Sequence, residues 1–286
     1  MNTEVMTNLA YLGPEGSFSH IAAFLHVAGR DEESGGLLKP MKSICEVFEA
    51  VESGDCEYGL VPYENSLAGN IAETLESFDT FMGCIHGEVY VPVNHVLMTA
   101  APDASEIERI YSKYEVFGQC HKWLQKNMPD AEQVSVASTS HAASLTKEDE
   151  KGAAIGSTLA AKHFKLSILE YELGDGVDNF TRFLVLGSNN RQPPKDGEPK
   201  NDKTTMRFVV PHQPGELARV LDIFCRMGVN LTHLALLPKA ISPMSRVFFV
   251  DFEGDAVERI DLTREMTRNG VGYEILGSYP KAEDLL

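Results

Sequence analysis

Apolar and polar positions in the first 187 residues repeat one pattern four times. A short apolar run is followed by a turn rich in hydroxyl or amide side chains, and then by a stretch with helical spacing. The runs predict strands at 9–12, 58–61, 134–136 and 153–155, with helices after them at 20–28, 71–78, 141–145 and 159–164. Strands that alternate with helices are typical of an α/β fold with parallel sheets. A further apolar run predicts a strand at 183–186, with Thr181 and Arg182 at its entry.

The last part of the chain follows a different order. Apolar runs predict strands at 204–211, 230–237, 246–252 and 271–277, and helices are predicted at 215–227 and 257–266. The order βαββαβ is ferredoxin-like. Small sheets of this kind often pair across a dimer axis, so we expect a homodimer or a dimer of dimers. Residues 188–203 hold three prolines and no other apolar residue, which predicts a linker between a domain at 8–187 and one at 204–281.

The charge of the chain excludes two classes of partner. It carries 42 acidic residues against 25 lysines and arginines, a formal net charge of −17. Such a charge repels the phosphate backbone and anionic lipid, so we expect no nucleic-acid partner and no membrane partner. Residues 1–187 hold 28 acidic and 12 basic residues, so nearly all of the excess lies in the first domain. An anionic ligand of that domain would therefore have to be held by local contacts.

The cysteines and the apolar runs give further expectations. Five cysteines at wide spacing include no Cys-x-x-Cys pair, which argues against a structural zinc site or a disulfide framework. Free thiols are typical of a reducing compartment, so we expect the cytoplasm. No apolar run reaches the ~18 residues of a membrane span, and residues 1–9 lack the features of a signal peptide. The scattered histidines, His95 among them, show no metal-ligand spacing and are predicted to be structural or surface residues.

The turns after the four predicted strands suggest a binding site. In α/β folds, ligands lie beyond the carboxyl ends of the strands, where helix N-termini offer free backbone N–H groups. Ser, Thr and Asn side chains there add donors, and several such turns facing one cleft would hold a carboxylate. The same residue types are also ordinary helix N-caps. On composition alone, Thr181 can likewise be interpreted as a hydroxyl at the edge of a strand, and Arg182 as a solvated charge.

Three strings resemble the signatures of the prephenate dehydratase family, in that family's order. They are Gly-Pro-Glu-Gly-Ser-Phe-Ser at 13–19, Val-Pro-Tyr-Glu-Asn-Ser at 61–66 and Asn-Phe-Thr-Arg-Phe at 179–183. Ser112 with Gln119-Cys120 resembles a fourth motif, and 138–143 a weaker fifth. Beyond the predicted linker, strings at 214–215, 228–232, 248–254 and 276–280 resemble the family's regulatory ACT domain. The similarity runs from Tyr11 to Lys281.

The resemblance implies a reaction and a fold. Prephenate would lose water and carbon dioxide and become phenylpyruvate, in the route to phenylalanine, on a two-lobed catalytic domain like that of periplasmic binding proteins. No cofactor and no metal are implied, which agrees with the lack of a P-loop, a Gly-x-Gly-x-x-Gly string or a metal motif. Thr181 would donate a hydrogen bond or a proton to the leaving hydroxyl, and Arg182 would bind a substrate carboxylate.

The resemblance also assigns further residues. The catalytic set that it implies is Thr181, Asn65 and Gln119. The substrate-binding set that it implies is Ser17, Glu64, Ser66, Ser112, Thr139, Arg182 and Phe183. The fourth motif departs from the family. Where the family commonly has Ser-His-Pro-Gln, this chain has Ser112-Lys113-Tyr114-Glu115. That change leaves the geometry of this loop open.

The C-terminal domain departs from the family at the expected effector site. The family binds phenylalanine through a Gly-Ala-Leu string and a Glu-Ser-Arg-Pro string, which correspond here to residues 215–217 and to Ala235-Leu236-Leu237-Pro238. Three apolar residues thus replace a carboxylate, a hydroxyl and a guanidinium. We therefore expect inhibition by phenylalanine to be weak, absent or replaced by another effector, with the site at Gly215, Leu217, Asn230 and Leu231. A domain that serves only dimerisation explains the same residues.

Three other functions fit the same residues. Arogenate dehydratase acts on the amino-acid form of the same substrate, and a non-aromatising decarboxylase would share the site, although Thr181 favours dehydration. Two-lobed α/β domains also serve as non-catalytic receptors of small anions. Turnover of prephenate or arogenate separates the enzymes from such a receptor.

Overall fold

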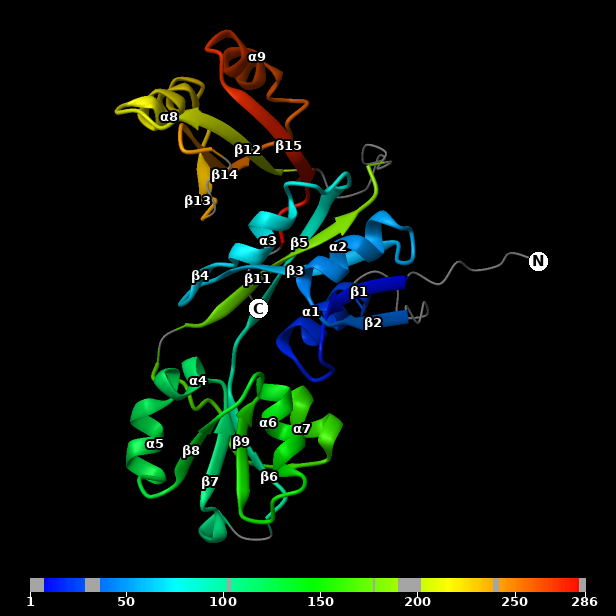
Figure 1. The fold of residues 1–286 in the computed structure, drawn as a ribbon, viewed down its shortest axis with the longest axis vertical. Helices are drawn as coiled ribbons and strands as arrows, with labels where there is room; N and C mark the ends of the chain where they lie inside the picture. Colours follow the sequence, from blue (N-terminus) through cyan, green and yellow to red (C-terminus); the bar gives the residue numbers. More distant parts are fainter. Residues whose placement is uncertain are drawn as a thin grey trace, which may run out of the picture.

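The computed structural model describes residues 8–28, 37–101, 104–176, 178–189, 202–238 and 242–282. Most of the linker predicted at 188–203 therefore lies outside the described residues. The described chain forms two α/β lobes and a C-terminal α/β domain that packs on the first lobe (Figure 1). Among the described residues, no helix is long and apolar enough to cross a membrane.

The first lobe is built on a mixed sheet of order β2-β1-β3-β11-β5, with the short β4 paired to β3. Strand β1 is parallel to β2 and β3, whereas β11 is antiparallel to β3 and to β5. The strands are β1 Asn8–Leu12, β2 Leu37–Met41, β3 Tyr58–Asn65, β4 Gly69–Asn70, β5 Cys84–Pro92 and β11 Phe180–Gly187. The helices are α1 Phe18–Ala28, α2 Ile44–Glu52 and α3 Ala72–Ser77.

The second lobe has a sheet of order β10-β6-β9-β7-β8. Strand β7 is parallel to β8 and β9, and β6 is antiparallel to β9 and β10. The strands are β6 Val96–Thr99, β7 Arg109–Ser112, β8 Glu132–Ser135, β9 Gly152–Gly156 and β10 Ser167–Glu170. The helices are the 3₁₀ turn η1 Ala104–Glu106, and α4 Tyr114–Gln119, α5 His121–Asn127, α6 Thr139–Thr146 and α7 Thr158–Phe164.

The prediction of an α/β fold is confirmed, but the sheets of both lobes are mixed and not parallel as predicted, and the connections explain why. The chain leaves the first lobe after β5 and returns to it with β11, once the second lobe is complete. The returning strand enters between β3 and β5 in the opposite direction to β3. It also begins at Phe180, so Thr181 and Arg182 lie inside the strand and not at its entry. Strand β11 thereby brings residues near 180 beside the end of β3, more than 110 residues earlier in the chain.

The C-terminal domain has the predicted ferredoxin-like order. Its sheet runs β13-β14-β12-β15, and all three pairings are antiparallel. Side chains on one face of β12, such as Met206, Phe208 and Val210, pack with the two helices. The elements are β12 Lys203–Pro211, α8 Glu216–Arg226, β13 Leu231–Leu236, β14 Ser245–Glu253, α9 Ile260–Arg268 and β15 Gly272–Tyr279.

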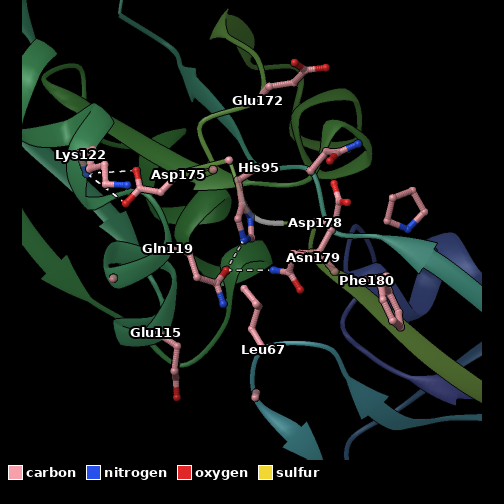
Figure 2. Close-up of a pocket in the computed structure, with 17 residues that line it drawn as sticks. Leu67, His95, Glu115, Gln119, Lys122, Glu172, Asp175, Asp178, Asn179 and Phe180 are labelled. Atoms are coloured by element: carbon pink, nitrogen blue, oxygen red, sulfur yellow. Dashed lines mark hydrogen bonds between the residues drawn. The ribbon is translucent and has the colours of Figure 1, made fainter.

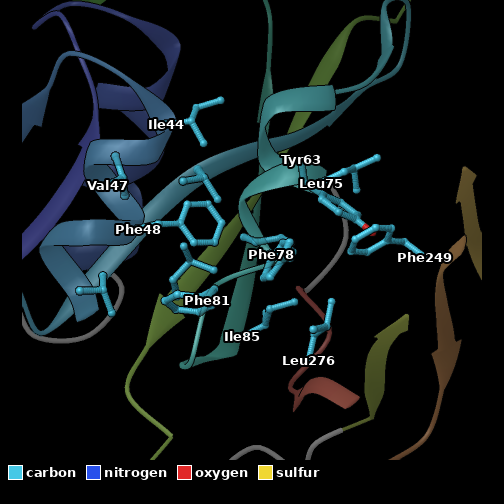
Figure 3. Close-up of a cluster of buried hydrophobic side chains, with 14 of the residues drawn as sticks. Ile44, Val47, Phe48, Tyr63, Leu75, Phe78, Phe81, Ile85, Phe249 and Leu276 are labelled. Carbon is cyan, nitrogen blue, oxygen red and sulfur yellow. The ribbon is translucent and has the colours of Figure 1, made fainter. Parts of the chain in front are cut away.

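The opposite face of this sheet shares a core with the first lobe. Phe78, after α3, lies 6.1 Å from Phe249 of β14 between ring centroids, and both side chains are buried (Figure 3). Gly277 of β15 is needed for this packing, because a Cβ there would lie 2.3 Å from the carbonyl oxygen of Ile85. Since the two domains bury a common apolar surface, the position of the C-terminal domain is coupled to the first lobe.

Candidate active site

Asn65, the last residue of β3, begins a chain of side-chain hydrogen bonds. Its Oδ1 accepts the backbone N–H groups of Leu67 at 3.1 Å and of Ala68 at 2.8 Å. An amide oxygen that accepts two backbone donors cannot exchange places with its nitrogen without losing both bonds. The turn after β3 therefore directs Nδ2 of Asn65 toward β11.

Three acceptors at the start of β11 and on the residue before it face this Nδ2 group. Asn65 Nδ2 donates to Asn179 Oδ1 at 2.8 Å, to the carbonyl oxygen of Phe180 at 3.0 Å and to Thr181 Oγ1 at 3.1 Å. Thr181 lies directly opposite Asn65 in the β3–β11 register. Because Thr181 Oγ1 accepts from Asn65, its own proton points elsewhere, and no described residue accepts it. Thr181 thus has a hydroxyl that is held in place and still able to donate.

The chain then crosses to the second lobe at Gln119. Asn179 Nδ2 donates to Gln119 Oε1 at 3.3 Å, and the same oxygen lies 3.0 Å from Nε2 of His95 (Figure 2). Gln119 ends α4, whereas His95 lies between β5 and β6 where the chain enters the second lobe. These bonds connect Thr181 of the first lobe to polar groups of the second.

A cavity of about 1170 Å³ lies along this connection, lined by residues of both lobes. His95, Gln119 and Asn179 line it, together with apolar groups such as Leu67 and Phe180 (Figure 2). A cavity of this size fits a small polar metabolite. Its charged lining residues are Glu115, Lys122, Glu172, Asp175 and Asp178. The lining therefore carries more negative than positive formal charge.

Several residues predicted to bind substrate make other contacts. Ser112 is fully buried, and its Oγ donates to the carbonyl oxygen of Ile155 at 2.9 Å. Ser17 accepts the backbone N–H of His20 at 3.2 Å and so caps the start of α1. Phe183 is buried in the core between β11 and α1. Thr139, the first residue of α6, is also buried.

Two other predicted residues lie beside the hydrogen-bond chain. Ser66 Oγ donates to the carbonyl oxygen of Asp178 at 3.3 Å and accepts the N–H of Phe180 at 3.1 Å. It therefore holds the segment that enters β11. Glu64 pairs with Arg182 in the β-sheet register, and its carboxylate lies 3.8 Å from His233 of the C-terminal domain. Of the ten predicted site residues, Gln119 lines the cavity, and Asn65 and Thr181 are linked to it through Asn179.

The loop at 13–17 holds the two lobes together on one side of the site. The carbonyl oxygen of Gly16 accepts Ser157 Oγ at 2.6 Å, and that of Glu15 accepts Ser140 Oγ. A Cβ on Gly16, whose φ is +81°, would lie 3.0 Å from the Cα of Ala160. The starts of α6 and α7, which we expected to hold a substrate carboxylate, therefore contact the first lobe instead.

Arg182 does not reach the cavity, which corrects its expected role in binding substrate. Successive residues of a strand point to opposite faces, so Arg182 points away from Thr181. Its side chain is 1 % exposed, and its guanidinium donates to Glu88 at 2.7 Å, to Tyr279 at 3.0 Å and to Asp251. Burial alone would lower the pKa of Arg182, but Asp251, Tyr279 and Glu88 raise it well above its ordinary value. The side chain thus ties β11 to the C-terminal domain.

Sequence reasoning missed Asn179 and His95. Asn179 stands inside one of the recognised strings, so its place beside Thr181 was a usable signal. His95 had no such signal, because a single histidine without spacing to other polar residues is uninformative. Lys122, the basic residue among the described cavity-lining residues, was likewise not predicted.

The fold is that of a two-lobed α/β protein with a ferredoxin-like domain attached, and the cavity between its lobes is lined in part by neutral amide groups. The family model of prephenate dehydratase matches residues 9–191. The chain belongs to the prephenate dehydratase family.

Known proteins similar to this chain cover nearly all of it. It is 35 % identical to a bifunctional chorismate mutase/prephenate dehydratase from Aquifex aeolicus, over 99 % of this chain and 76 % of that protein. A solved prephenate dehydratase from Arthrobacter aurescens in complex with L-Phe is 28 % identical, with a TM-score of 0.83 over 98 % of this chain and 92 % of that one. A structure described as a novel type of quorum-quenching acylase is 26 % identical, with a TM-score of 0.82 over 96 % and 98 % of the two chains.

Replacement of Arg182 should destabilise the fold. Arg182→Met leaves the buried carboxylates of Glu88 and Asp251 without their main partner, so the free energy of unfolding should fall by about 3–5 kcal/mol. Urea denaturation measures this loss. Arg226→Met is the control, because Arg226 forms an exposed ion pair with Asp222 and should cost less than ~1 kcal/mol. A stable Arg182→Met protein with only a raised Michaelis constant would return Arg182 to substrate binding.

The buried His233 should make stability depend on pH. Burial lowers the pKa of His233, and Arg182 and Lys203 lower it further, against the opposing effect of Asp251 and Glu64. Between the unfolded pKa of about 6.5 and the lower folded pKa, the unfolded chain binds more protons, so stability falls as pH falls, by at most ~1.4 kcal/mol per pH unit.

His233→Gln should therefore flatten the decline of the unfolding free energy between pH 7 and 5.5. Thr232→Ala, at the neighbouring exposed position of the same strand, should keep the slope of the unmodified protein. Equal slopes in the His233→Gln and unmodified proteins would show that His233 does not contribute.

Proposed function

We propose that this chain converts prephenate to phenylpyruvate with loss of water and carbon dioxide, in phenylalanine biosynthesis and without a cofactor. The observation that carries the proposal is the Thr181 hydroxyl. It accepts from Asn65 at 3.1 Å, retains a proton to donate, and is connected through Asn179 to the cavity. A positioned donor is what a departing ring hydroxyl requires, since hydroxide must leave as water.

Thr181 acts as an oriented hydrogen-bond donor in this proposal. A threonine hydroxyl is too weak an acid to titrate near neutral pH, so it stabilises the leaving oxygen or relays a proton to it. Asn65 contributes by accepting two backbone N–H groups and directing its own N–H at Thr181. The donor is thus held in position before substrate binds, and little reorganisation is needed during the reaction.

The cavity supplies groups for the rest of the substrate. Gln119 and Asn179 offer amides, and Lys122 offers an ammonium group for a carboxylate. Apolar lining residues such as Val93 and Phe180 provide a surface that disfavours the charge of the departing carboxylate. In this proposal, neutral donors and Lys122 take over the binding role that we first assigned to Arg182.

Arogenate is a second candidate substrate, and one observation favours it. The cavity lining includes Glu115, Glu172, Asp175 and Asp178. Arogenate carries an amino group where prephenate carries a ketone, and a carboxylate stabilises an ammonium group nearby. Turnover rates with both substrates, in the same buffer, decide between them.

Two readings from other classes have weaker support. A non-catalytic receptor would bind prephenate without turning it over, so it would leave the positioned Thr181 without a use. An acylase that works through a covalent intermediate needs a nucleophilic hydroxyl or thiol at the substrate. The described residues that line the cavity include no serine or cysteine, and the Thr181 hydroxyl accepts from the Asn65 amide without a described base hydrogen-bonded to it.

We infer further that the C-terminal domain is an ACT regulatory module and that the chain forms a homodimer. The ferredoxin-like order supports the first point, and L-Phe in the relative from Arthrobacter aurescens supports a small effector. Leu234 and Leu236 of the edge strand β13 are 41 % and 47 % exposed, which favours a partner for this edge. The cytoplasm remains an inference from the free cysteines.

Removal of the Thr181 hydroxyl should slow the reaction. Thr181→Val keeps the shape of the side chain and should lower kcat for prephenate by ~10²–10³, the usual effect of one lost transition-state donor. Thr181→Ser keeps a hydroxyl and is the matched control, with a loss of less than ~10-fold expected. The measurement is phenylpyruvate absorbance. Full turnover by Thr181→Val would refute the assignment.

L-Phenylalanine should be a weak inhibitor. Leu236 and Leu237 replace polar groups of the family's effector string. The residues expected to bind the effector, Gly215, Leu217, Asn230 and Leu231, do not line the cavity between the lobes. Initial rates with increasing phenylalanine should show no saturable inhibition in the micromolar range. Strong micromolar inhibition would mean that the apolar string still forms an effector site.

A further inference from the structure

His95 is a buried cavity residue with an unusual pattern of hydrogen bonds. Its side chain is 4 % exposed, and Nε2 lies 3.0 Å from Gln119 Oε1. Nδ1 is buried and has no hydrogen-bond partner among the described residues. The ring of Phe18 packs edge-on against the imidazole at 5.6 Å, which restricts its orientation. Within the described part of the chain, the only polar contact of the ring is therefore with Gln119.

The direction of this contact follows from the chain of amides. The backbone N–H groups of Leu67 and Ala68 make the Asn65 oxygen an acceptor, so Asn65 Nδ2 donates to Asn179 Oδ1. The Nδ2 group of Asn179 must then donate to Gln119, which identifies the accepting atom as Oε1. His95 Nε2 faces the same oxygen and must carry a proton.

The amide of Gln119 is thereby held in one orientation. Its oxygen accepts from both His95 and Asn179, as Figure 2 shows, and its Nε2 group has no hydrogen-bond partner in the described part of the chain. Gln119 lines the cavity. The amide that remains available for a ligand is thus a donor, which suits a carboxylate or keto oxygen. A reversed amide would offer an acceptor and would repel an anion.

We propose that His95 is a positioning residue that, as a neutral Nε2–H donor, holds the Gln119 amide with its N–H groups toward the substrate. This inference rests on the proposed function, because Gln119 is the group that touches substrate. His95 needs no protonation change for this task. Burial lowers its pKa, against a smaller opposing effect of the bond to Gln119, so the ring stays neutral near pH 7. In this tautomer, Nδ1 carries a lone pair and no proton. The buried nitrogen without a hydrogen-bond partner is therefore an acceptor and not an N–H donor.

The alternative role of His95 is to fill space between the lobes. If His95 only fills space, its replacement should lower stability. It should also lower kcat/KM by the same factor whether or not the Gln119 side chain is present. The two roles are separated by a double-mutant cycle, because a residue that acts through another has no effect once that other is removed.

The experiment measures kcat/KM for prephenate in the unmodified enzyme and in five variants. His95→Leu should lower it by ~10–100-fold, because a misplaced binding group costs about that much. Gln119→Ala should also lower it, and the double variant should equal Gln119→Ala alone. His95→Gln, whose amide N–H can replace Nε2–H, should recover activity to within ~10-fold of the unmodified enzyme. His86→Leu, at a histidine of β5 bonded to the carbonyl oxygen of Ser188, is the control and should keep full activity.

Multiplicative losses in the double variant would overturn the proposal, as would full activity in His95→Leu. If His95→Leu fails to fold, His95→Met, which has a flexible side chain and no N–H donor, takes its place in the same cycle with Gln119→Ala. ¹⁵N chemical shifts of the unmodified enzyme give a test independent of activity, since His95 should carry its proton on Nε2 at pH 7. A proton on Nδ1 would overturn the proposal. Failure of the unmodified enzyme to turn over prephenate would instead refute the proposed function.

Discussion

The opposite orientation of two neighbouring side chains on β11 determines the organisation of this protein. Thr181 faces Asn65 and the hydrogen-bond chain to the cavity, and Arg182 faces the C-terminal domain. Because side chains alternate along a strand, these two consecutive residues point to opposite faces of the sheet. One contributes to the candidate site and the other to the domain interface. The pairing of β11 between β3 and β5 therefore sets the geometry of the candidate site and the domain arrangement together.

The interface on the Arg182 side is a small buried network of charges. Glu88 of the first lobe accepts from Arg182 and from Lys203 at 2.8 Å, and Asp251 of the C-terminal domain accepts from Arg182. Two cations and two carboxylates compensate each other, which is the condition for burying charge at tolerable cost. The burial of Asp251 would raise its pKa, but Arg182 and His233 lower it below its usual range. A shift of the C-terminal domain would have to break this network or move β11 with it.

The hydrogen-bond chain on the Thr181 side consists of polar groups that carry no charge. An isolated charge would be costly to bury beside the apolar lining, and most formal charges of the first domain are negative. Amides and hydroxyls avoid that cost and can be oriented by backbone N–H groups. Two backbone N–H groups, those of Leu67 and Ala68, fix the orientation of the Asn65 amide. The direction of every hydrogen bond from Asn65 to His95 follows from that orientation. In the proposed function, these oriented groups and Lys122 bind the anionic substrate by local contacts, because long-range electrostatic attraction to the acidic first domain is unfavourable.

Short-range patterns predicted much of this protein. Apolar spacing identified most helices and strands, including the βαββαβ order, because periodicity reflects the local burial of each element. Thr181, Asn65 and Gln119 were predicted from strings that resemble family motifs, and the structure joins all three in one hydrogen-bond chain through Asn179. The strand after 58 was predicted too short, since the Pro-Tyr-Glu-Asn stretch resembles a turn but continues β3 to Asn65.

Only the tertiary structure decided the rest, and for one physical reason. The mixed sheets, the direction of Arg182 and the contact of His95 with Gln119 depend on pairings between segments that are far apart in the chain. Such pairings depend on how much surface the whole chain buries when it folds. A pattern within a short segment does not predict that quantity. The sequence by itself determined the elements and the chemically distinctive residues. The packing of β11 between two strands, and of the C-terminal sheet on the first lobe, decided which of those residues face the cavity.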